Sequence, residues 1–314
     1  MIYAKDLKHK NIAFCVLNWG LGHATRSSVL ISRLLRQGNT IYIISEGQAQ
    51  IFLKERFPQC EHIFGPEQNI RYPKSEKGLK RALFLQSPTF YKQHRKEKRF
   101  IRDFLQSHDI DVVISDNRYG MFSKDVPSIF VGHQIDLRIP VINQIHRKFI
   151  EQFDFLWIVD RPENRLAGEL SEANGIKIPW TYLGLLSNIS PESNQKKPID
   201  CLILLSGIQE QRKRLEQKLL AINWPENLTI KWVKGSPEHL TSPEELQRLL
   251  SASKALISRS GYSTMMDTET FDLKTLWIPT PGQIEQEYLA KRKGNFLLES
   301  EISDEKILKW LCSK

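Results

Sequence analysis

No run of apolar residues in this 314-residue sequence approaches the roughly 20 that a membrane-spanning helix needs. The first ten residues also lack the apolar core and cleavage site of a secretory signal, so we expect a cytoplasmic protein. Cysteine is scarce, and the four present are too widely spaced to form a zinc-binding or redox pair. Cys15 and Cys201 fall inside apolar runs, which indicates buried, reduced thiols with a structural role.

Low-complexity tracts are absent as well, and a composition of 40% apolar residues is that of an ordinary folded protein. The length suits two domains of roughly 150 residues each. A net charge of +9 favours an anionic partner, which leaves nucleic acid, anionic lipid and a diphosphate-bearing substrate as candidates. Since no RNA- or DNA-binding motif is visible, we expect no nucleic-acid partner.

Short apolar runs alternate with helix-like stretches along the whole chain, a pattern typical of parallel strands buried on both faces. The predicted strands span residues 11–17, 40–45, 111–115, 128–131, 155–159, 200–205, 229–233, 255–257 and 275–278. A polar segment with two prolines, residues 187–198, interrupts the pattern and reads as a linker. We therefore predict an α/β fold of two Rossmann-like, doubly wound domains, 1–186 and 199–314, facing across a cleft. The last helix is a candidate to pack back onto the first domain.

The first predicted strand leads directly into a Gly-Leu-Gly-His-Ala-Thr-Arg loop over residues 20–26 and then into a helix. Gly20 and Gly22 let the backbone turn tightly and approach a ligand, and with Arg26 they are candidates for the acceptor side or for the loop itself. Arg26 stands where a dinucleotide fingerprint has a small residue, which argues against a dehydrogenase. His23 lies at the mouth of the loop, where an imidazole can take a proton from a hydroxyl near neutral pH. A purely structural helix-start histidine is the alternative.

Two further strands end in polar residues on the same edge of the predicted sheet. Asp116 and Asn117 follow one strand, and His133 and Gln134 follow the next. A carboxylate at Asp116 is suited to orient His23 and to stabilise its charged form, although a helix cap or turn aspartate fits equally well. For His133 and Gln134, contact with an acceptor substrate and a loop-bracing role both remain open.

The second half carries polar loops after its own strands. Small and hydroxyl residues over 258–264 open a helix that reaches Asp267, an arrangement that suits a diphosphate followed by a ribose. Arg259 is placed either to pair with phosphate or to brace the loop. After the next strand, amide and carboxylate side chains can read sugar hydroxyls. The candidate donor-side residues are Gly207, Arg259, Ser260, Gly261, Ser263, Thr264, Asp267, Gln283, Glu285 and Gln286.

In this order the motifs resemble GT-B glycosyltransferases related to family 28, which include peptidoglycan N-acetylglucosaminyltransferases of the MurG type. The resemblance runs from the loop at residues 20–26 to Gln286. It implies that His23 is the base, paired with Asp116, and that residues 1–186 hold the acceptor. By the same resemblance, residues 199–314 bind the diphosphate near Arg259 and the ribose through Asp267, while Glu285 and Gln286 contact the donor sugar.

The resemblance implies an inverting transfer of a hexose or N-acetylhexosamine from a nucleoside-diphosphate sugar, with UDP the favoured carrier, to a glycan or lipid-linked acceptor. Neither a metal nor another cofactor is expected, because no carboxylates or histidines have metal-ligand spacing. A nucleotide-sugar hydrolase or epimerase, or a noncatalytic nucleotide-binding protein, would need almost the same motifs. Leu289-Ala290 replaces the usual Asn-Ala, and Asn18-Trp19 replaces small residues, so the sugar and acceptor are left open.

Residues 81–105 join apolar side chains to a run of lysines and arginines. A basic amphipathic helix of this kind can lie on an anionic membrane, which would suit a lipid-linked acceptor at the inner face of the cell membrane. A solvated helix face is the alternative.

Overall fold

The computed structural model describes residues 2–67, 79–193, 196–235 and 241–313. Within them the chain forms two compact units, the first ending at Leu186 and the second beginning at Ser187. Each unit has its own parallel sheet with helices on both faces, so the predicted α/β fold of two doubly wound units is confirmed.

The sheet of the first unit has seven parallel strands in the order β3-β2-β1-β4-β5-β6-β7. They are β1 (Asn11–Val16), β2 (Thr40–Ser45), β3 (Glu61–Phe64), β4 (Val112–Asp116), β5 (Ser128–Gly132), β6 (Phe155–Ile158) and β7 (Trp180–Tyr182). The central strands β4 and β5 are buried along their whole length, as expected for strands covered on both faces.

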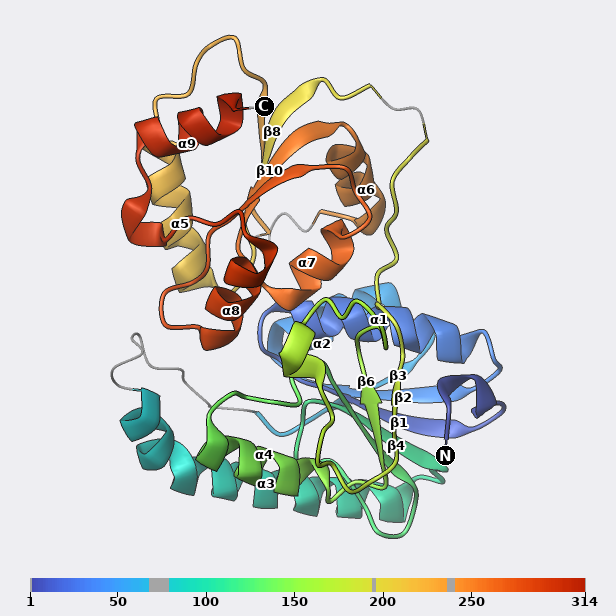
Figure 1. Cartoon of the computed structure of the whole chain (residues 1–314). Coiled ribbons are helices and arrows are strands. Elements are labelled where there is room, and N and C mark those ends of the chain that lie inside the picture. Colours follow the sequence, from blue (N-terminus) through green and yellow to red (C-terminus); the bar gives the residue numbers. More distant parts are fainter. Residues whose placement is uncertain (1, 68–78, 194–195, 236–240, 314) are drawn as a thin grey trace. The chain divides into compact units, whose positions relative to one another are not determined.

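Four α-helices cover this sheet in pairs (Figure 1): α1 (Leu21–Leu35) and α2 (Gly47–Arg56) on one face, α3 (Leu79–Ser107) and α4 (Pro140–Ile150) on the other. Ile101 and Phe104 of α3 pack in one buried cluster with Cys15. Ile150 of α4 packs in another with Phe130. Short 3-10 turns over Ala4–Asp6 and Gly168–Ser171 complete the unit.

The second unit has a four-stranded parallel sheet in the order β11-β10-β8-β9. Its strands are β8 (Ile199–Leu204), β9 (Ile230–Val233), β10 (Ser253–Ser258) and β11 (Lys274–Trp277). Its helices are α5 (Gln209–Leu220), α6 (Pro243–Ser251), α7 (Tyr262–Thr268), α8 (Ile284–Lys293) and α9 (Asp304–Cys312), and a 3-10 turn spans Glu299–Glu301.

The last helix, α9, packs on its own unit. Ile307 of α9 is fully buried in one cluster with Leu215 and Leu219 of α5 and Ile203 of β8. Leu250 of α6 belongs to a separate cluster, formed with Leu202 and Leu204 of β8 and Leu256 of β10 among others. The apolar face of α9 is therefore used within the second unit.

Two strands were missed by sequence pattern, β3 and β7. Both lie at the edges of the first sheet, and neither contains a fully buried residue. Half-exposed edge strands lack the continuous apolar run that identifies a central strand, so their pairing is visible only in the folded sheet.

Cys15 and Cys201 are free and buried, and burial raises the pKa of each thiol to about 12. None of the described helices combines the length with the apolar composition that a membrane-spanning segment requires.

Candidate functional site

The carboxyl ends of β1, β4 and β5 bring together four polar side chains of the first unit, His23, Arg26, Asp116 and His133, which we call the His23 cluster. Strand register explains the meeting, because Val16 pairs with Asp116 and Asp116 with Val131. Residues that follow these three strands therefore emerge side by side at one edge of the sheet.

The loop before α1 needs glycine at one position. Gly20, the residue before α1, has φ of 66°, a left-handed conformation that glycine adopts without strain. The chain then enters α1 at Leu21, which places His23 and Arg26 one turn apart on the same helix face. Gly22 lies inside the first turn of α1.

His23 contacts Asp116 as the sequence suggested, with Nδ1 3.0 Å from Oδ1. The carboxylate, only 1% exposed, also accepts a 2.6 Å hydrogen bond from the hydroxyl of Ser27. Burial alone would raise the pKa of Asp116, but the charge of Arg26 and the contact with His23 hold it well below its usual range. Asp116 is therefore a permanent carboxylate.

Arg26 was grouped with the acceptor-side loop, and the structure gives it an internal position. Its side chain is 2% exposed and donates to both oxygens of Asp116, from Nε at 3.0 Å and from Nη2. Nη1 lies 2.6 Å from Nδ1 of His133, and Nη2 lies 2.8 Å from Nδ1 of His23. Neither Ser27 nor this role of Arg26 was identified from sequence, because their partners lie about 90 residues away.

The electrostatic environment keeps His23 neutral. Burial lowers the pKa of His23, Arg26 lowers it further, and Asp116 only partly opposes them. A neutral imidazole whose Nδ1 faces a carboxylate can use Nε2 to accept a proton from a substrate hydroxyl.

Asn117 and Gln134 stand beside the cluster on the main chain. Asn117 follows Asp116 with φ of 59°, a left-handed conformation that asparagine tolerates better than most residues. The carbonyl of Gln134 accepts a 3.0 Å hydrogen bond from Nε2 of His146, whose Nδ1 meets the hydroxyl of Tyr119 at 2.8 Å. His146, which sequence reasoning missed, thus braces the segment after β5.

The loop that follows Asp116 is anchored by a buried ion pair. Arg118 is 0% exposed and pairs with Glu97 of α3, which is 2% exposed. Nε of Arg118 lies 2.8 Å from Oε1 of Glu97. The other carboxylate oxygen of Glu97 accepts the backbone N–H of Gly120 at 2.9 Å. No sequence motif marked Glu97, since its charge lies in a run of exposed lysines and arginines.

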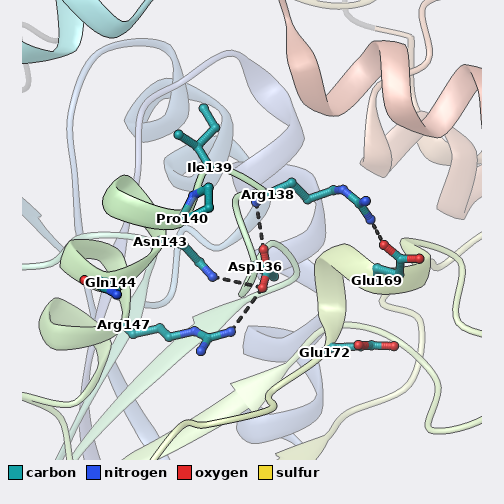
Figure 2. A pocket seen from close by; sticks show the side chains of 9 residues that line it. All are labelled: Asp136, Arg138, Ile139, Pro140, Asn143, Gln144, Arg147, Glu169 and Glu172. Atoms are coloured by element: carbon teal, nitrogen blue, oxygen red, sulfur yellow. Dashed lines mark hydrogen bonds and ion pairs between the residues drawn. The ribbon is translucent and has the colours of Figure 1, made fainter.

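A polar hollow of about 430 Å³ opens in the first unit between α4 and the turn Gly168–Ser171. Figure 2 shows Asp136 at its centre, where the carboxylate accepts the N–H of Arg138 and side-chain bonds from Asn143 and Arg147. Asp136 lies three residues beyond His133. This arrangement of amide, carboxylate and guanidinium groups can form several hydrogen bonds to a hydroxyl-rich ligand.

In the second unit, Arg259 braces its own loop, which is one of the two roles left open for it. The side chain is 1% exposed and ion-paired with Glu299, with Nη2 and Oε2 2.5 Å apart. Its other donors reach the carbonyls of Ile278, Pro279 and Gln211. Glu299, which sequence reasoning missed, is fully buried and also pairs with Arg214.

The hydroxyls and amides predicted for the donor side hold one loop to the next. Ser260 donates to the carbonyl of Gln286 at 2.8 Å, and the amide of Gln286 contacts Gln283 at 2.6 Å. Thr264 meets Ser206, beside Gly207, at 3.3 Å. Loops after β8, β10 and β11 are thereby joined at the carboxyl edge of the second sheet.

Asp267 occupies the end of α7 and accepts a 2.7 Å hydrogen bond from the hydroxyl of Ser187. Burial raises its pKa to about 6. Helix α7 itself has only seven residues, and it begins after Gly261 without a side-chain cap. Ser263 and Glu285 lie on α7 and α8. Within the described residues, no three His, Cys, Asp or Glu side chains are grouped to hold a metal ion.

Comparison with known proteins gives a family match over part of the chain. Residues 10–152 match the model of glycosyl transferase family 1. A search of curated proteins gives no match. Solved structures match over nearly the whole chain, at identities that establish the fold alone.

Three examples illustrate the structural likeness. Arabidopsis thaliana UGT89C1, complexed with UDP-L-rhamnose, is 12% identical with a TM-score of 0.64, covering 98% of this chain and 90% of that one. The spinosyn rhamnosyltransferase SpnG, complexed with thymidine diphosphate, is 11% identical with a TM-score of 0.62, covering 97% and 92%. Acinetobacter baumannii MurG is 14% identical with a TM-score of 0.57, covering 97% and 91%.

Proposed function

We propose that this chain is a glycosyltransferase that moves a hexose or N-acetylhexosamine from a UDP-sugar to a glycan or lipid-linked acceptor. Its likeness to solved GT-B glycosyltransferases and the match of residues 10–152 to glycosyl transferase family 1 support the proposal. The motifs of the first and second units support a relation to family 28. The observation that carries the proposal is the contact between His23 and Asp116 at the carboxyl edge of the first sheet.

The reaction is a direct displacement. Nε2 of His23 takes the proton of an acceptor hydroxyl while the oxygen bonds to the anomeric carbon and the bond to the diphosphate breaks. The configuration inverts, and the nucleoside diphosphate leaves with the electron pair of the broken bond. Asp116 holds the imidazole by Nδ1 and stabilises the charge that His23 acquires.

The donor is assigned to the carboxyl edge of the second sheet. Asp267 and the backbone around Ser260 and Gly261 are proposed to hold the ribose and diphosphate, and Glu285 and Gln286 the sugar. The solved structures of UGT89C1 and SpnG, which contain UDP-L-rhamnose and thymidine diphosphate, support a nucleoside-diphosphate donor. Metal-independent transfer is part of the proposal.

The acceptor is assigned to the first unit, where the hollow around Asp136 is lined by both carboxylates and guanidinium groups. Such a lining matches the hydroxyls of a sugar better than an apolar aglycone.

A membrane contact is proposed for α3. Among its described side chains, the exposed charged residues are six cations and one acid: Lys92, Arg95, Lys96, Lys98, Arg99, Arg102 and Asp103. The predicted basic surface spans residues 81–105, and the side chains of residues 81–88 lie outside the part of the chain that the structure describes. We expect the protein to sediment with vesicles rich in anionic phosphatidylglycerol at low salt but not with phosphatidylcholine. A Lys96→Glu/Arg99→Glu variant should lose that binding; failure of the wild type to bind would refute the contact.

Donor identity is tested by thermal shift with UDP, CDP, GDP and several UDP-sugars. Release of nucleoside diphosphate is then followed with and without a glycan or lipid extract. Stabilisation by one nucleotide and extract-dependent release are the expected results. Equal release in water alone would instead establish the hydrolase, and no stabilisation by any nucleotide would overturn the donor assignment.

The base assignment is tested with His23→Gln, which should lower kcat by about 100-fold or more while donor binding is unchanged. His9→Asn is the matched control, because His9 is exposed and precedes β1, at the opposite edge of the sheet. Near-normal turnover in His23→Gln would show that another group accepts the proton.

A further inference from the structure

We infer that Arg26 is a positioning residue that sets the protonation of both histidines in the His23 cluster: it holds His133 in the Nε2–H tautomer and keeps His23 uncharged. The inference concerns proton positions and rests on the proposed function only where His23 is called the base. The motif alone suggested a role for Arg26 in the loop or toward the acceptor, and neither role involves the two imidazoles.

The tautomer of His133 follows from the chemistry of the guanidinium group. Arginine offers only donors and stays protonated, so a ring nitrogen that forms a hydrogen bond with it must accept. Nδ1 of His23 is a different case, because it also faces the Asp116 carboxylate and donates its proton there, which leaves Arg26 as a positive neighbour of that nitrogen. Nη1 of Arg26 lies 2.6 Å from Nδ1 of His133. Nδ1 of His133 therefore carries the lone pair, and the ring proton is on Nε2. A doubly protonated His133 would place N–H against N–H at this contact.

The charge of His23 follows from the same side chain. Nη2 of Arg26 lies 2.8 Å from Nδ1 of His23, which is also 3.0 Å from Oδ1 of Asp116. In a simple histidine–aspartate pair, the carboxylate favours the imidazolium form. Here Arg26 is bound to both oxygens of that carboxylate, so the two charges cancel next to His23. The imidazolium therefore gains less from Asp116 than in a simple pair, and it is repelled by Arg26.

Burial strengthens this effect, since Arg26 and Asp116 are 2% and 1% exposed and His23 is 12% exposed. Among the described residues, the charged or titratable groups facing His23 are Arg26 on its own helix, Asp116 at the end of β4 and His133 after β5, and the first two act in opposite directions on its pKa. The consequence is a pKa of His23 below its ordinary value of 6.5, so that the base is mostly uncharged at pH 6.5. Once it has taken a proton, its acid form is unstable and passes the proton on readily.

Long-range ¹H–¹⁵N NMR spectra of histidine side chains, titrated with pH, test the inference without turnover. His23→Gln and His133→Gln variants assign the signals. In the wild type we expect His133 as the Nε2–H tautomer and a His23 midpoint below 6.5. A protonated Nδ1 on neutral His133, or a His23 midpoint at or above 6.5, overturns the inference.

The variant Arg26→Gln adds a second readout. With Asp116 no longer neutralised, the His23 midpoint should rise by about one pH unit, a tenfold change in proton affinity. The acid limb of kcat/KM should move with it. Arg36→Gln, an exposed residue at the end of the same helix, is the control and should shift neither. An unchanged midpoint in a folded Arg26→Gln protein also overturns the inference.

If Arg26→Gln fails to fold, the wild-type spectra still decide. The two proposals fail separately: absence of sugar transfer with the expected histidine spectra refutes the proposed function alone. The converse result, transfer with a charged His23 at pH 6.5, refutes the role of Arg26 alone.

Discussion

Replacing Glu97 by Gln should lower the free energy of unfolding by about 3 kcal/mol, because it leaves Arg118 buried without a counter-charge. Both side chains are at most 2% exposed, and the carboxylate serves Arg118 with one oxygen and the Gly120 N–H with the other. Loss of one partner from such a pair costs about 3–5 kcal/mol, and the lower end applies because glutamine keeps one acceptor. At about 2–4 °C per kcal/mol, the midpoint of thermal unfolding should fall by roughly 6–12 °C.

The same helix contains a matched control. Arg102 and Asp103 form an ion pair with the same N–O distance of 2.8 Å, but their side chains are 61% and 55% exposed. Water screens that pair, so Asp103→Asn should change stability by no more than about 0.5 kcal/mol. Urea denaturation followed by tryptophan fluorescence compares the two variants. Equal effects would refute the argument that burial, rather than distance, decides the strength of these pairs.

Three further outcomes are expected. The pKa of Asp267, raised by burial to about 6, lies above its unfolded value of 3.8, so the stability from its neutral form is present below about pH 4 and is lost as pH rises through 6. Asp267→Asn should therefore reduce the change in the free energy of unfolding, measured by urea denaturation, between about pH 4 and 7. Asp272→Asn, at an exposed position, is the control and should leave this pH dependence as it is in the wild type. An unchanged pH dependence in Asp267→Asn contradicts the burial effect. Glu299→Gln should destabilise the protein by about 3 kcal/mol and weaken nucleotide binding in thermal shift, because Arg259 loses its buried partner. The control is Glu301→Gln, because Glu301 forms an exposed ion pair with Lys306. Equal losses of stability in the two variants would contradict a special role for the buried Arg259–Glu299 pair. Nucleoside diphosphate release should survive EDTA treatment, and a loss restored by added Mg²⁺ would show that a metal is needed.

The central strands were readable from sequence because burial on both faces demands an unbroken apolar run. Predicted strand 40–45 coincides with β2, and predicted strand 111–115 differs from β4 by one residue at each end. The edge strands β3 and β7 are only partly buried, so they need no continuous apolar run, and the sequence pattern did not predict them. Helix α9 was readable as a helix, but its partner was not, because amphipathic spacing marks an apolar face without naming the surface it covers.

The candidate catalytic pair was also accessible from sequence. His23 and Asp116 each follow a strand, and parallel strands present their carboxyl ends at one edge. Strand order supplied the remaining condition: β1 and β4 are neighbours, which puts the two side chains 3.0 Å apart. The role of each residue in turnover stays a prediction until the variants are measured.

By itself, the sequence determined the alternation of strands and helices, the glycine turn before α1 and the polar character of the loops, since these depend on local spacing and backbone conformation. Only the tertiary structure decided which charges are buried and which partners they meet. Arg26 and Arg259 look alike as loop arginines, yet Arg26 meets partners 90 and 107 residues distant and Arg259 meets partners 40 and 48 residues distant. The physical reason is that burial and charge pairing are properties of neighbours in space, and strand order, which no local pattern contains, selects those neighbours.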